Sequence, residues 1–492
     1  MKQNPVQFTF KLSVLIILFM ISPLNQAKGQ TKPAKIEGLM KLYAEYGQFN
    51  GSILVAEHGK VIYKKGFGLA NMEWDIPNQS DTKFRLGSIT KQFTSMLILQ
   101  LVQQGKLRLD GKISDYLPDY PKKTGDKITI HQLLTHTSGI FGYTELPNFF
   151  RDISRDPYSP EAFLKMFSDS ALLFEPGSRF SYSNSGYYIL GVIIEKVTGK
   201  PYEQVLQENI LSPVNMKNTG YDHYGMILKK RASGYEKDGL KYLNAAYLDM
   251  SLPYSAGALY STVEDLYLWD QVLYTDKLLS EKSRDLLFKK YVPAFGASYG
   301  YGWVIGNVPV GHSNDSVMMI GHGGGINGFN TLITRIPSTQ DLIVLLNNTG
   351  AAGLNNISKA ITGILYDKPY DMPKRSIAYK VLDEIMQNGI ESGLKTYNDL
   401  KVNHLDTYAL LENEMNNVGY RLLGEKKVME AIEIFKLNVD AFPKSANVYD
   451  SLGEAYMVNG DKELAIKNYQ KSVELDPGNT NGIQTLKKLQ AK

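Results

Sequence analysis

The chain has 492 residues, of which 43% are hydrophobic and 21% charged, and its formal net charge is +4. This composition is typical of a globular protein with two or three domains and excludes a disordered or collagen-like chain. The chain contains no cysteine, which excludes disulfides, thiolate nucleophiles, cysteine-based zinc sites and a lipid-bearing N-terminal cysteine. The charge is small and no basic stripe stands out, so we expect no nucleic-acid partner.

Residues 1–29 have the features of a secretion signal. Lysines precede an apolar run over 12–21, and Ala27 and Gly29 place small residues where a signal peptidase cleaves. The run is too short to cross a bilayer, which needs about 20 residues, so we expect no stable membrane span after cleavage. The sequence therefore predicts a periplasmic or secreted protein, and the alternative is an uncleaved N-terminal anchor.

Hydrophobic patterning predicts one large domain after the signal. Alternating residues over 50–64 predict a β-hairpin. Apolar residues at helical spacing predict helices over 89–104 and 187–197, each followed by a glycine. The pattern changes to strands over 299–347. Strands at both ends with helices between them predict an α+β domain over about 31–367, with a sheet built from both ends of the domain.

The last part of the chain predicts an all-α repeat module. Its composition becomes charged and helical beyond about residue 369, where a 34-residue repeat begins to show. Positions typical of the tetratricopeptide pattern are Gly419, Ala431, Phe435 and Pro443 in the first copy, and Tyr449, Leu452, Gly453, Tyr456, Gly460, Ala465, Tyr469 and Pro477 in the second. We expect a helical linker over 368–410 and tetratricopeptide repeats over 411–492. Two or three repeats alone bury only a small core. We therefore expect them to pack on the preceding domain or on a protein partner.

A Ser-x-x-Lys motif begins at Ser80, Ser88 and Ser392, and only one copy has a suggestive context. Ser88 lies at the start of a predicted apolar helix, where free N–H groups and the helix dipole favour an oxygen that becomes anionic. Lys91 lies one turn further on the same face. The same field and partial burial would lower its pKa and let a neutral amine accept the serine proton. The alternative is a helix-capping serine beside a solvated lysine.

A second motif, Tyr182-Ser183-Asn184, precedes the second predicted helix. A tyrosine at this place could pass a proton between a nucleophile and a leaving group. The amide of Asn184 could hold a substrate carbonyl. The alternative is that these residues only form a loop that caps the helix.

A third motif, His322-Gly323-Gly324-Gly325, lies between two predicted strands. Successive glycines cost backbone entropy, and a substrate lying close against the chain would explain them. The N–H of Gly325 could pair with that of Ser88 to form an oxyanion hole. A lone histidine such as His322 is more often a structural hydrogen-bonding residue than a catalyst.

Together, these three motifs resemble those of the serine β-lactamase and penicillin-binding-protein superfamily. The Tyr-Ser-Asn element and the run Leu-Leu-Thr-His-Thr-Ser-Gly over 133–139 resemble class C β-lactamases and their esterase and D-aminopeptidase relatives. The resemblance covers about residues 40–365. It implies an antiparallel sheet flanked by helices and a helical lobe, with the active site of a serine hydrolase between them.

The resemblance also implies roles for particular residues. Ser88 would be the acylated nucleophile, Lys91 its base and Tyr182 the second acid and base. Asn184 would orient the substrate, and the N–H of Gly325 would be the second oxyanion donor. The adjoining Gly323 and Gly324 would lie against the substrate. No cofactor and no metal are implied.

The third motif departs from the β-lactamase pattern, because His322-Gly323-Gly324 replaces Lys-Thr-Gly. The lost charge and hydroxyl would otherwise hold a substrate carboxylate. A neutral imidazole can still donate to an ester, amide or phenolic oxygen, and its charge would vary near pH 6.5. We therefore expect His322 to join the catalytic set of an esterase or D-amino-acid peptidase acting on a small ester, amide or peptide. A class C-like β-lactamase or D,D-peptidase is the alternative.

Three competing interpretations carry less weight. Gly296-Ala297-Ser298-Tyr299-Gly300 matches the nucleophile elbow of α/β-hydrolases, but a strand-like run follows where a helix is required. His131 and His136 are five residues apart, and no carboxylate completes a metal site with them. A non-catalytic envelope scaffold that uses the repeats is the third alternative, and intact Ser88, Lys91 and Tyr182 argue against it.

Overall fold

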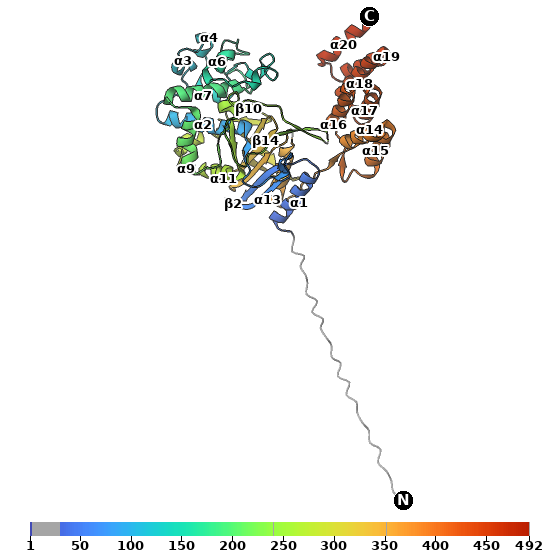
Figure 1. Cartoon of the computed structure of the whole chain (residues 1–492), viewed down its shortest axis with the longest axis horizontal. Helices are drawn as coiled ribbons and strands as arrows, with labels where there is room; N and C mark the ends of the chain where they lie inside the picture. The colour runs from blue at the N-terminus through green and yellow to red at the C-terminus, as the bar shows by residue number, and fades with distance from the viewer. Residues whose placement is uncertain (2–29, 240, 351, 492) are drawn as a thin grey trace.

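The computed structural model describes Met1 and residues 30–239, 241–350 and 352–491, so the predicted signal over 1–29 lies almost wholly outside the described residues. Figure 1 shows an α+β body that contains the first part of the chain and a separate set of helices that contains the last part. Among the described residues, every helix is too short or too polar to span a bilayer.

An eight-stranded antiparallel sheet forms the centre of the body. The strand order is β10-β11-β12-β13-β14-β15-β1-β2. The bounds are β1 (Gly51–Glu57), β2 (Lys60–Phe67), β10 (Val292–Ala294), β11 (Ala297–Tyr299), β12 (Val304–Pro309), β13 (Ser316–Ile326), β14 (Phe329–Ile336) and β15 (Asp341–Asn347). Gly51 pairs with Asn347, so the two ends of the body meet in one sheet. The predicted hairpin and the predicted sheet built from both ends of the domain are confirmed.

Helices cover both faces of this sheet, which is why its central strands β1 and β15 carry continuous apolar runs, over 53–56 and 342–346. Ile53 and Val55 of β1 pack with α1 (Lys32–Glu45) and α13 (Leu354–Leu365) on one face. Leu54 and Ala56 point to the other face, because successive side chains of a strand alternate. This other face packs against α11 (Val263–Val272) and the helices of the lobe.

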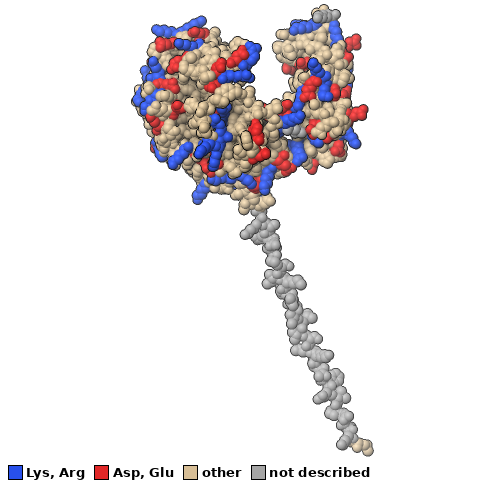
Figure 2. Space-filling model, viewed as in Figure 1, with Lys and Arg blue, Asp and Glu red and all other residues tan. Residues whose placement is uncertain are grey.

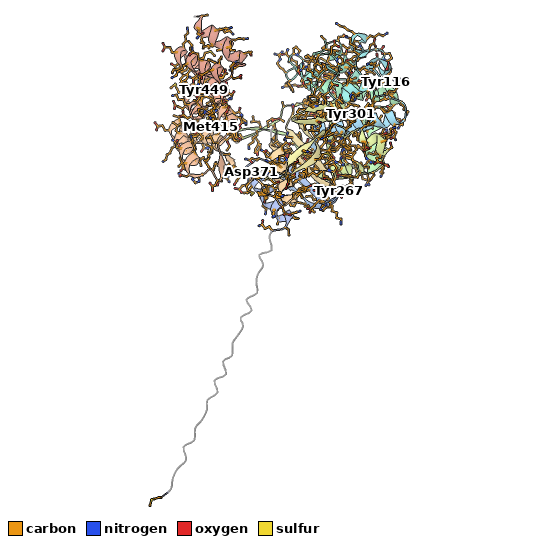
Figure 3. The ribbon with its side chains drawn as sticks, turned by 180° about the vertical axis from the view of Figure 1, so that it is seen from behind. Tyr116, Tyr267, Tyr301, Asp371, Met415 and Tyr449 are labelled. Carbon is orange, nitrogen blue, oxygen red and sulfur yellow. The ribbon has the colours of Figure 1, made fainter. Side chains whose placement is uncertain are left out.

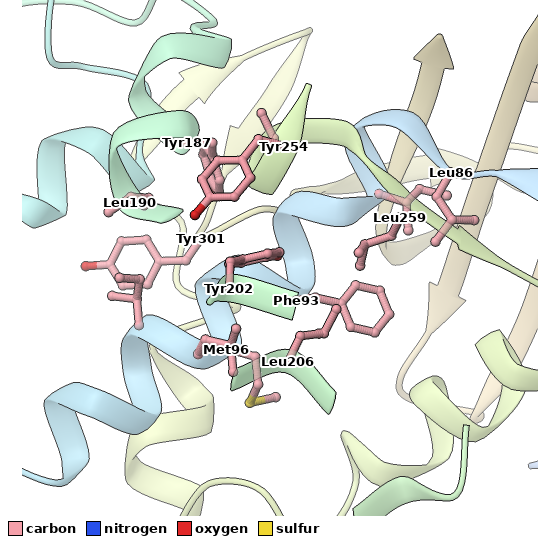
Figure 4. Close-up of a cluster of buried hydrophobic side chains, with 14 of the residues drawn as sticks. Leu86, Phe93, Met96, Tyr187, Leu190, Tyr202, Leu206, Tyr254, Leu259 and Tyr301 are labelled. Carbon is pink, nitrogen blue, oxygen red and sulfur yellow. The ribbon is translucent and has the colours of Figure 1, made fainter. Parts of the chain in front are cut away.

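The helical lobe is organised around two buried helices, α2 (Thr90–Gln103) and α7 (Asn184–Thr198). A helix that is apolar on all sides is stable only when it is surrounded by protein. Figure 4 shows Phe93 and Met96 of α2 close to Tyr202 and Leu206, and Tyr187 of α7 nearby. The two helices predicted over 89–104 and 187–197 are therefore confirmed, with the second beginning slightly earlier.

Short elements complete the body. The helices are α3 (Ile113–Tyr116), α4 (Lys122–Gly125), α5 (Ile130–Leu134), α6 (Pro160–Ser168), α8 (Tyr202–Leu206), α9 (Ser212–Val214), α10 (Tyr254–Gly257) and α12 (Glu281–Asp285). The strands are β3 (Leu69–Asn71), β4 (Ile76–Pro77), β5 (Phe84–Arg85), β6 (Gly220–Tyr221), β7 (Tyr235–Asp238), β8 (Lys241–Asn244) and β9 (Leu259–Ser261). Ser298 of the Gly-x-Ser-x-Gly motif lies on β11, and the next element is strand β12, so the nucleophile-elbow geometry is absent from this described segment.

The C-terminal helices form a second core. They are α14 (Ile377–Asn388), α15 (Ile390–Asn403), α16 (Glu412–Gly424), α17 (Val428–Ala441), α18 (Ala446–Asn459), α19 (Lys462–Leu475) and α20 (Thr480–Gln490), with a short parallel pair of β16 (Arg375–Ser376) and β17 (Tyr408–Ala409). The core includes residues of α14 and α15, so the expected linker over 368–410 contributes to the helical module. Figure 3 shows Met415 and Tyr449 in this module and Asp371 at its junction with the body.

Polar contacts join the module to the body. Arg421 of α16 donates to Asp238 at the end of β7, at 2.7 Å. Arg375 pairs with Glu45 at 2.6 Å. Figure 2 shows Lys and Arg interspersed with Asp and Glu over the visible face, and a hollow between the lobe and the module. These contacts place the helical module beside the preceding domain, which is one of the two arrangements that the sequence predicts.

One feature of the sheet positions the Ser-x-x-Lys motif that begins at Ser88. Strand β12 pairs with β13 only as far as Gly321, so His322 to Ile326 extend beyond its end. The short 3-10 turn η1 (Gly87–Ile89), which carries Ser88, packs against this extended part of β13. Thr331 on the neighbouring β14 donates to the carbonyl of Leu86, at 2.7 Å, and fixes the start of the turn.

The fit between η1 and β13 predicts different effects for alanine at two neighbouring glycines. A Cβ on Gly324 would overlap the carbonyl oxygen of Leu86 and the hydroxyl of Thr331, whereas a Cβ on Gly325 has no heavy atom within 4 Å. Overpacking of a tight site usually costs about 1–3 kcal/mol, so Gly324→Ala should lower the free energy of unfolding by about that amount. Urea denaturation measures it. Gly325→Ala is the matched control and should unfold like the wild type. Equal stability of the two variants would contradict the described packing.

Candidate active site

Ser88 and Lys91 meet at the start of α2, as their spacing predicts. Lys91 Nζ lies 3.0 Å from Ser88 Oγ, 2.8 Å from Asn184 Oδ1 and 2.8 Å from the carbonyl oxygen of Ala256. The Lys91 side chain is fully buried, and this burial lowers its pKa well below the usual lysine value. The alternative of a solvated lysine is therefore wrong, and Ser88 makes no capping bond to the helix.

The partners of Lys91 are consistent with a neutral amine. A neutral amine has two N–H groups and one lone pair. Asn184 Oδ1 and the Ala256 carbonyl can only accept, so they use both N–H groups. The lone pair is then left for the hydroxyl proton of Ser88. Asn184 thus orients the lysine through its side-chain oxygen, while its amide nitrogen is available to a substrate.

Tyr182 covers the Ser88–Lys91 pair from the loop before α7. Lys91 Nζ lies 4.9 Å from the centre of the Tyr182 ring. Burial raises the pKa of Tyr182, and the Ser88 hydroxyl partly opposes this rise. The two oxygens do not meet the geometry of a hydrogen bond, and Tyr182 Oη has no hydrogen-bond partner among the described residues. The phenol is therefore protonated at neutral pH and free to bond to an atom of a substrate. Ser183 caps α7 by accepting from the Gly186 N–H, so this motif also serves the capping role that was its alternative.

A buried hydrogen-bonded chain lies behind Tyr182. The N–H of Ser183 donates to His136 Nδ1 at 3.0 Å, and His136 Nε2 lies 3.2 Å from Tyr299 Oη. Tyr299 Oη lies 2.9 Å from His322 Nε2, and His322 Nδ1 lies 2.5 Å from the carbonyl oxygen of Gly323. With both imidazoles neutral, each group in this chain can donate a hydrogen bond to the next, from the Ser183 amide to the Gly323 carbonyl. The His136 ring packs on Tyr182, with 4.3 Å between the ring centres.

This hydrogen-bonded chain corrects the expectation that the charge of His322 varies near pH 6.5 and that its imidazole donates to the substrate. Burial lowers the pKa of His322 to about 4, with Lys91 contributing, so its charge does not vary near pH 6.5. Both ring nitrogens already bond to Tyr299 and Gly323, and His322 does not line the cavity beside Ser88. Both ring nitrogens of His322 are therefore occupied by protein partners in this arrangement rather than free for a substrate. Sequence reasoning gave no role to His136 or Tyr299, although His136 lies in the Leu-Leu-Thr-His-Thr-Ser-Gly run.

The glycines of the third motif have different roles. An ideal Cβ on Gly87 would lie 2.9 Å from the amide nitrogen of Gly325, and Gly87 has a φ of +55°. The backbones of η1 and β13 therefore touch beside Ser88, which is the close approach an oxyanion hole needs. Gly324 is required for packing against Leu86 rather than for contact with a substrate, and Gly323 does not line the cavity. Gly87, which the sequence analysis did not single out, is constrained by a close backbone contact, as Gly324 is.

A cavity of about 380 Å³ opens beside Ser88. Ser88, Asn184 and Gly325 lie in its wall. Much of the remaining wall is apolar and includes Phe149, Leu252 and Phe329. A cavity of this size holds a small molecule or the end of a peptide. Within the described ranges, no group of His, Asp and Glu side chains is placed to bind a metal ion.

Comparison with known proteins gives a consistent assignment. The family model described as Beta-lactamase matches residues 34–362. Over 326 residues, which are 66% of this chain and 76% of the relative, the chain is 33% identical to PbpX of Bacillus subtilis (strain 168), described as a penicillin-binding protein. The penicillin binding protein from Bacillus halodurans superposes with a TM-score of 0.59 and 28% identity, covering 66% of this chain and 98% of that one. The D-amino acid amidase from Ochrobactrum anthropi SV3 superposes with a TM-score of 0.60 and 26% identity, covering 68% of this chain and 97% of that one. The chain therefore belongs to the β-lactamase family, as a serine hydrolase related to the penicillin-binding proteins.

Proposed function

We propose that the chain is an exported serine hydrolase that forms an acyl-enzyme at Ser88 with a small ester or amide. The observation that carries this proposal is the buried Lys91 amine, which contacts Ser88 Oγ and has only neutral partners. A lysine without a carboxylate partner in a dry site loses its proton easily and becomes a base. Export rests on the sequence of residues 1–29 alone.

The proposed reaction follows from the positions of the residues. Lys91 takes the hydroxyl proton as Ser88 Oγ attacks the substrate carbonyl, and the N–H groups of Ser88 and Gly325 stabilise the oxyanion. Tyr182 donates its proton to the leaving group as the bond to that group breaks, and regains a proton from Lys91. A water molecule then hydrolyses the acyl-enzyme, with the same groups acting in reverse. The products are the free acid and the alcohol or amine.

The surroundings of Ser88 favour an ester or amide over a β-lactam. The described lining of the cavity contains no lysine, arginine or histidine that would hold a substrate carboxylate. The D-amino acid amidase among the structural relatives is consistent with an amide substrate. The class C-like β-lactamase or D,D-peptidase remains the alternative within the same chemistry, and a non-catalytic scaffold remains the alternative of another class.

We also propose that the C-terminal helices are tetratricopeptide repeats that bind a protein partner. In two successive helix pairs, a glycine of the first helix lies against an aromatic ring of the second. Gly419 contacts Phe435, and Gly453 contacts Tyr469, at positions 34 residues apart. This repeated contact supports the repeat pattern read from the sequence.

Covalent labelling tests the nucleophile. A fluorophosphonate probe should modify Ser88, and mass spectrometry of the digested protein should locate the adduct there. Ser88→Ala should abolish labelling and hydrolysis. Ser298→Ala, which alters the serine of the Gly-x-Ser-x-Gly motif, is the matched control and should be labelled like the wild type. An adduct at another residue of the folded protein would contradict the proposal.

The pH dependence of kcat/KM tests the base. Lys91 must be neutral to accept a proton, so activity should rise with pH as Lys91 loses its proton. Because burial lowers the pKa of Lys91, the midpoint of this rise should lie well below 10.5. Lys91→Arg keeps the charge at every pH and should lower kcat/KM by about 10²-fold or more. Wild-type rates in this variant would show that another group is the base.

A substrate panel tests the position of His322. We expect p-nitrophenyl acetate and D-alanyl p-nitroanilide to be hydrolysed with higher kcat/KM than nitrocefin. Because His322 does not line the cavity, His322→Gln should keep this order of preference even if it lowers all rates. A wild-type preference for nitrocefin would favour the β-lactamase alternative. A reversed order in the variant would mean that His322 contacts the substrate.

A further inference from the structure

One charged side chain enters the cavity beside Ser88. Among the described residues that line this cavity, Glu236 alone carries a charge. It lies on β7, far along the chain from the three motifs, and the sequence analysis did not single it out. None of the ion pairs among the described residues includes it, so its charge faces the cavity without a cationic partner.

The structure holds this carboxylate in a defined place. Gly328, in the turn between β13 and β14, donates its N–H to Glu236 Oε1 at 2.8 Å. Gly350 lies against the other oxygen, Oε2, where any side chain would overlap the carboxylate. The preceding residue, Tyr235, donates its N–H to Asn348 and accepts from the N–H of Gly350. Glu236 is thus fixed on both sides by backbone of the body.

The carboxylate is within the reach of a small substrate bound at Ser88. Gly328 follows Gly325 by three residues, and three residues span at most about 11 Å when fully extended. The chain turns between these two residues, which shortens the distance further. A substrate whose carbonyl lies at Gly325 can therefore extend a few bonds to the carboxylate held by Gly328.

We propose that Glu236 binds a protonated amine carried by the acyl part of the substrate. This proposal rests on the proposed hydrolysis at Ser88 and specifies its substrate class. A carboxylate in a mostly apolar cavity is stabilised by a cation that can form a charge-assisted hydrogen bond with it. The same charge repels a substrate carboxylate. The apolar wall formed by Phe149, Leu252 and Phe329 holds the hydrocarbon between the amine and the carbonyl.

Two pairs of substrates that differ only in the charged group test this proposal. One pair is D-phenylalanyl p-nitroanilide and its N-acetyl derivative, and the other is 6-aminohexanoyl p-nitroanilide and hexanoyl p-nitroanilide. In at least one pair, the amine should have a kcat/KM about tenfold higher. Glu236→Gln keeps an oxygen that accepts from Gly328, so it should fold normally, and the ratio of kcat/KM between the amine and its neutral partner should fall to about one. Glu175→Gln, an exposed residue outside the cavity, is the control and should keep the preference.

Binding measurements separate this proposal from the catalytic one. Ser88→Ala cannot form an acyl-enzyme, so calorimetry can measure its affinity for each intact substrate. The amine should bind about tenfold more tightly than its neutral partner, the difference should shrink in high salt, and Ser88→Ala/Glu236→Gln should abolish it. If this binding is observed but the wild-type protein hydrolyses none of the substrates, the result would support the amine site and reject the proposed function. Equal binding within both pairs, or a preference that survives Glu236→Gln, would overturn the amine site.

Discussion

The burial of a single lysine amine constrains the rest of this site. Lys91 has no exposed surface, and its contacts are a serine hydroxyl, an amide oxygen and a backbone carbonyl. A buried ammonium without an anionic partner is costly, and the lower-energy state is the neutral amine. The amine is held by the apolar packing of α2 between α7 and the short helix α10, which carries Ala256. The core of the helical lobe therefore determines the protonation state on which the proposed chemistry depends.

The site also depends on the close approach of two backbone segments, η1 and β13. β13 is longer than its neighbour β12, and η1 lies beside the part of β13 that extends past the end of β12. This contact requires Gly87 and Gly324, since a Cβ at either would meet main-chain atoms of the opposing segment. The serine thus stands beside the edge of the sheet, where backbone amides are within reach of a reacting carbonyl. Helix and sheet both contribute to the site because it is built at their contact.

The groups around the reacting atoms are kept neutral. Burial lowers the pKa values of His136 and His322, and the tyrosine between them completes a chain that needs no net charge. This chain fixes the loop that carries Tyr182 through the N–H of Ser183. With the surroundings neutral, the charge of Glu236 is the main electrostatic feature of the cavity wall. Its strand continues to Asp238, which Arg421 of the helical module binds, so the module and the cavity wall share one short hairpin.

Local patterns in the sequence determined the α+β class, the buried helices, the hairpin, the helical character of the C-terminus and the serine–lysine pair. The helices, the hairpin and the serine–lysine pair depend on residues within one or two turns of chain, where periodicity and spacing are sufficient. The α+β class follows from the order of these elements along the chain. The roles of His322, Gly324, His136, Tyr299 and Glu236 were decided only by the tertiary structure. Whether an imidazole faces a substrate or a buried tyrosine, and whether a glycine serves a ligand or a packing contact, depends on segments distant in sequence. A carboxylate on β7 becomes part of the cavity only because the turn after β13 and the backbone after β15 fold against it.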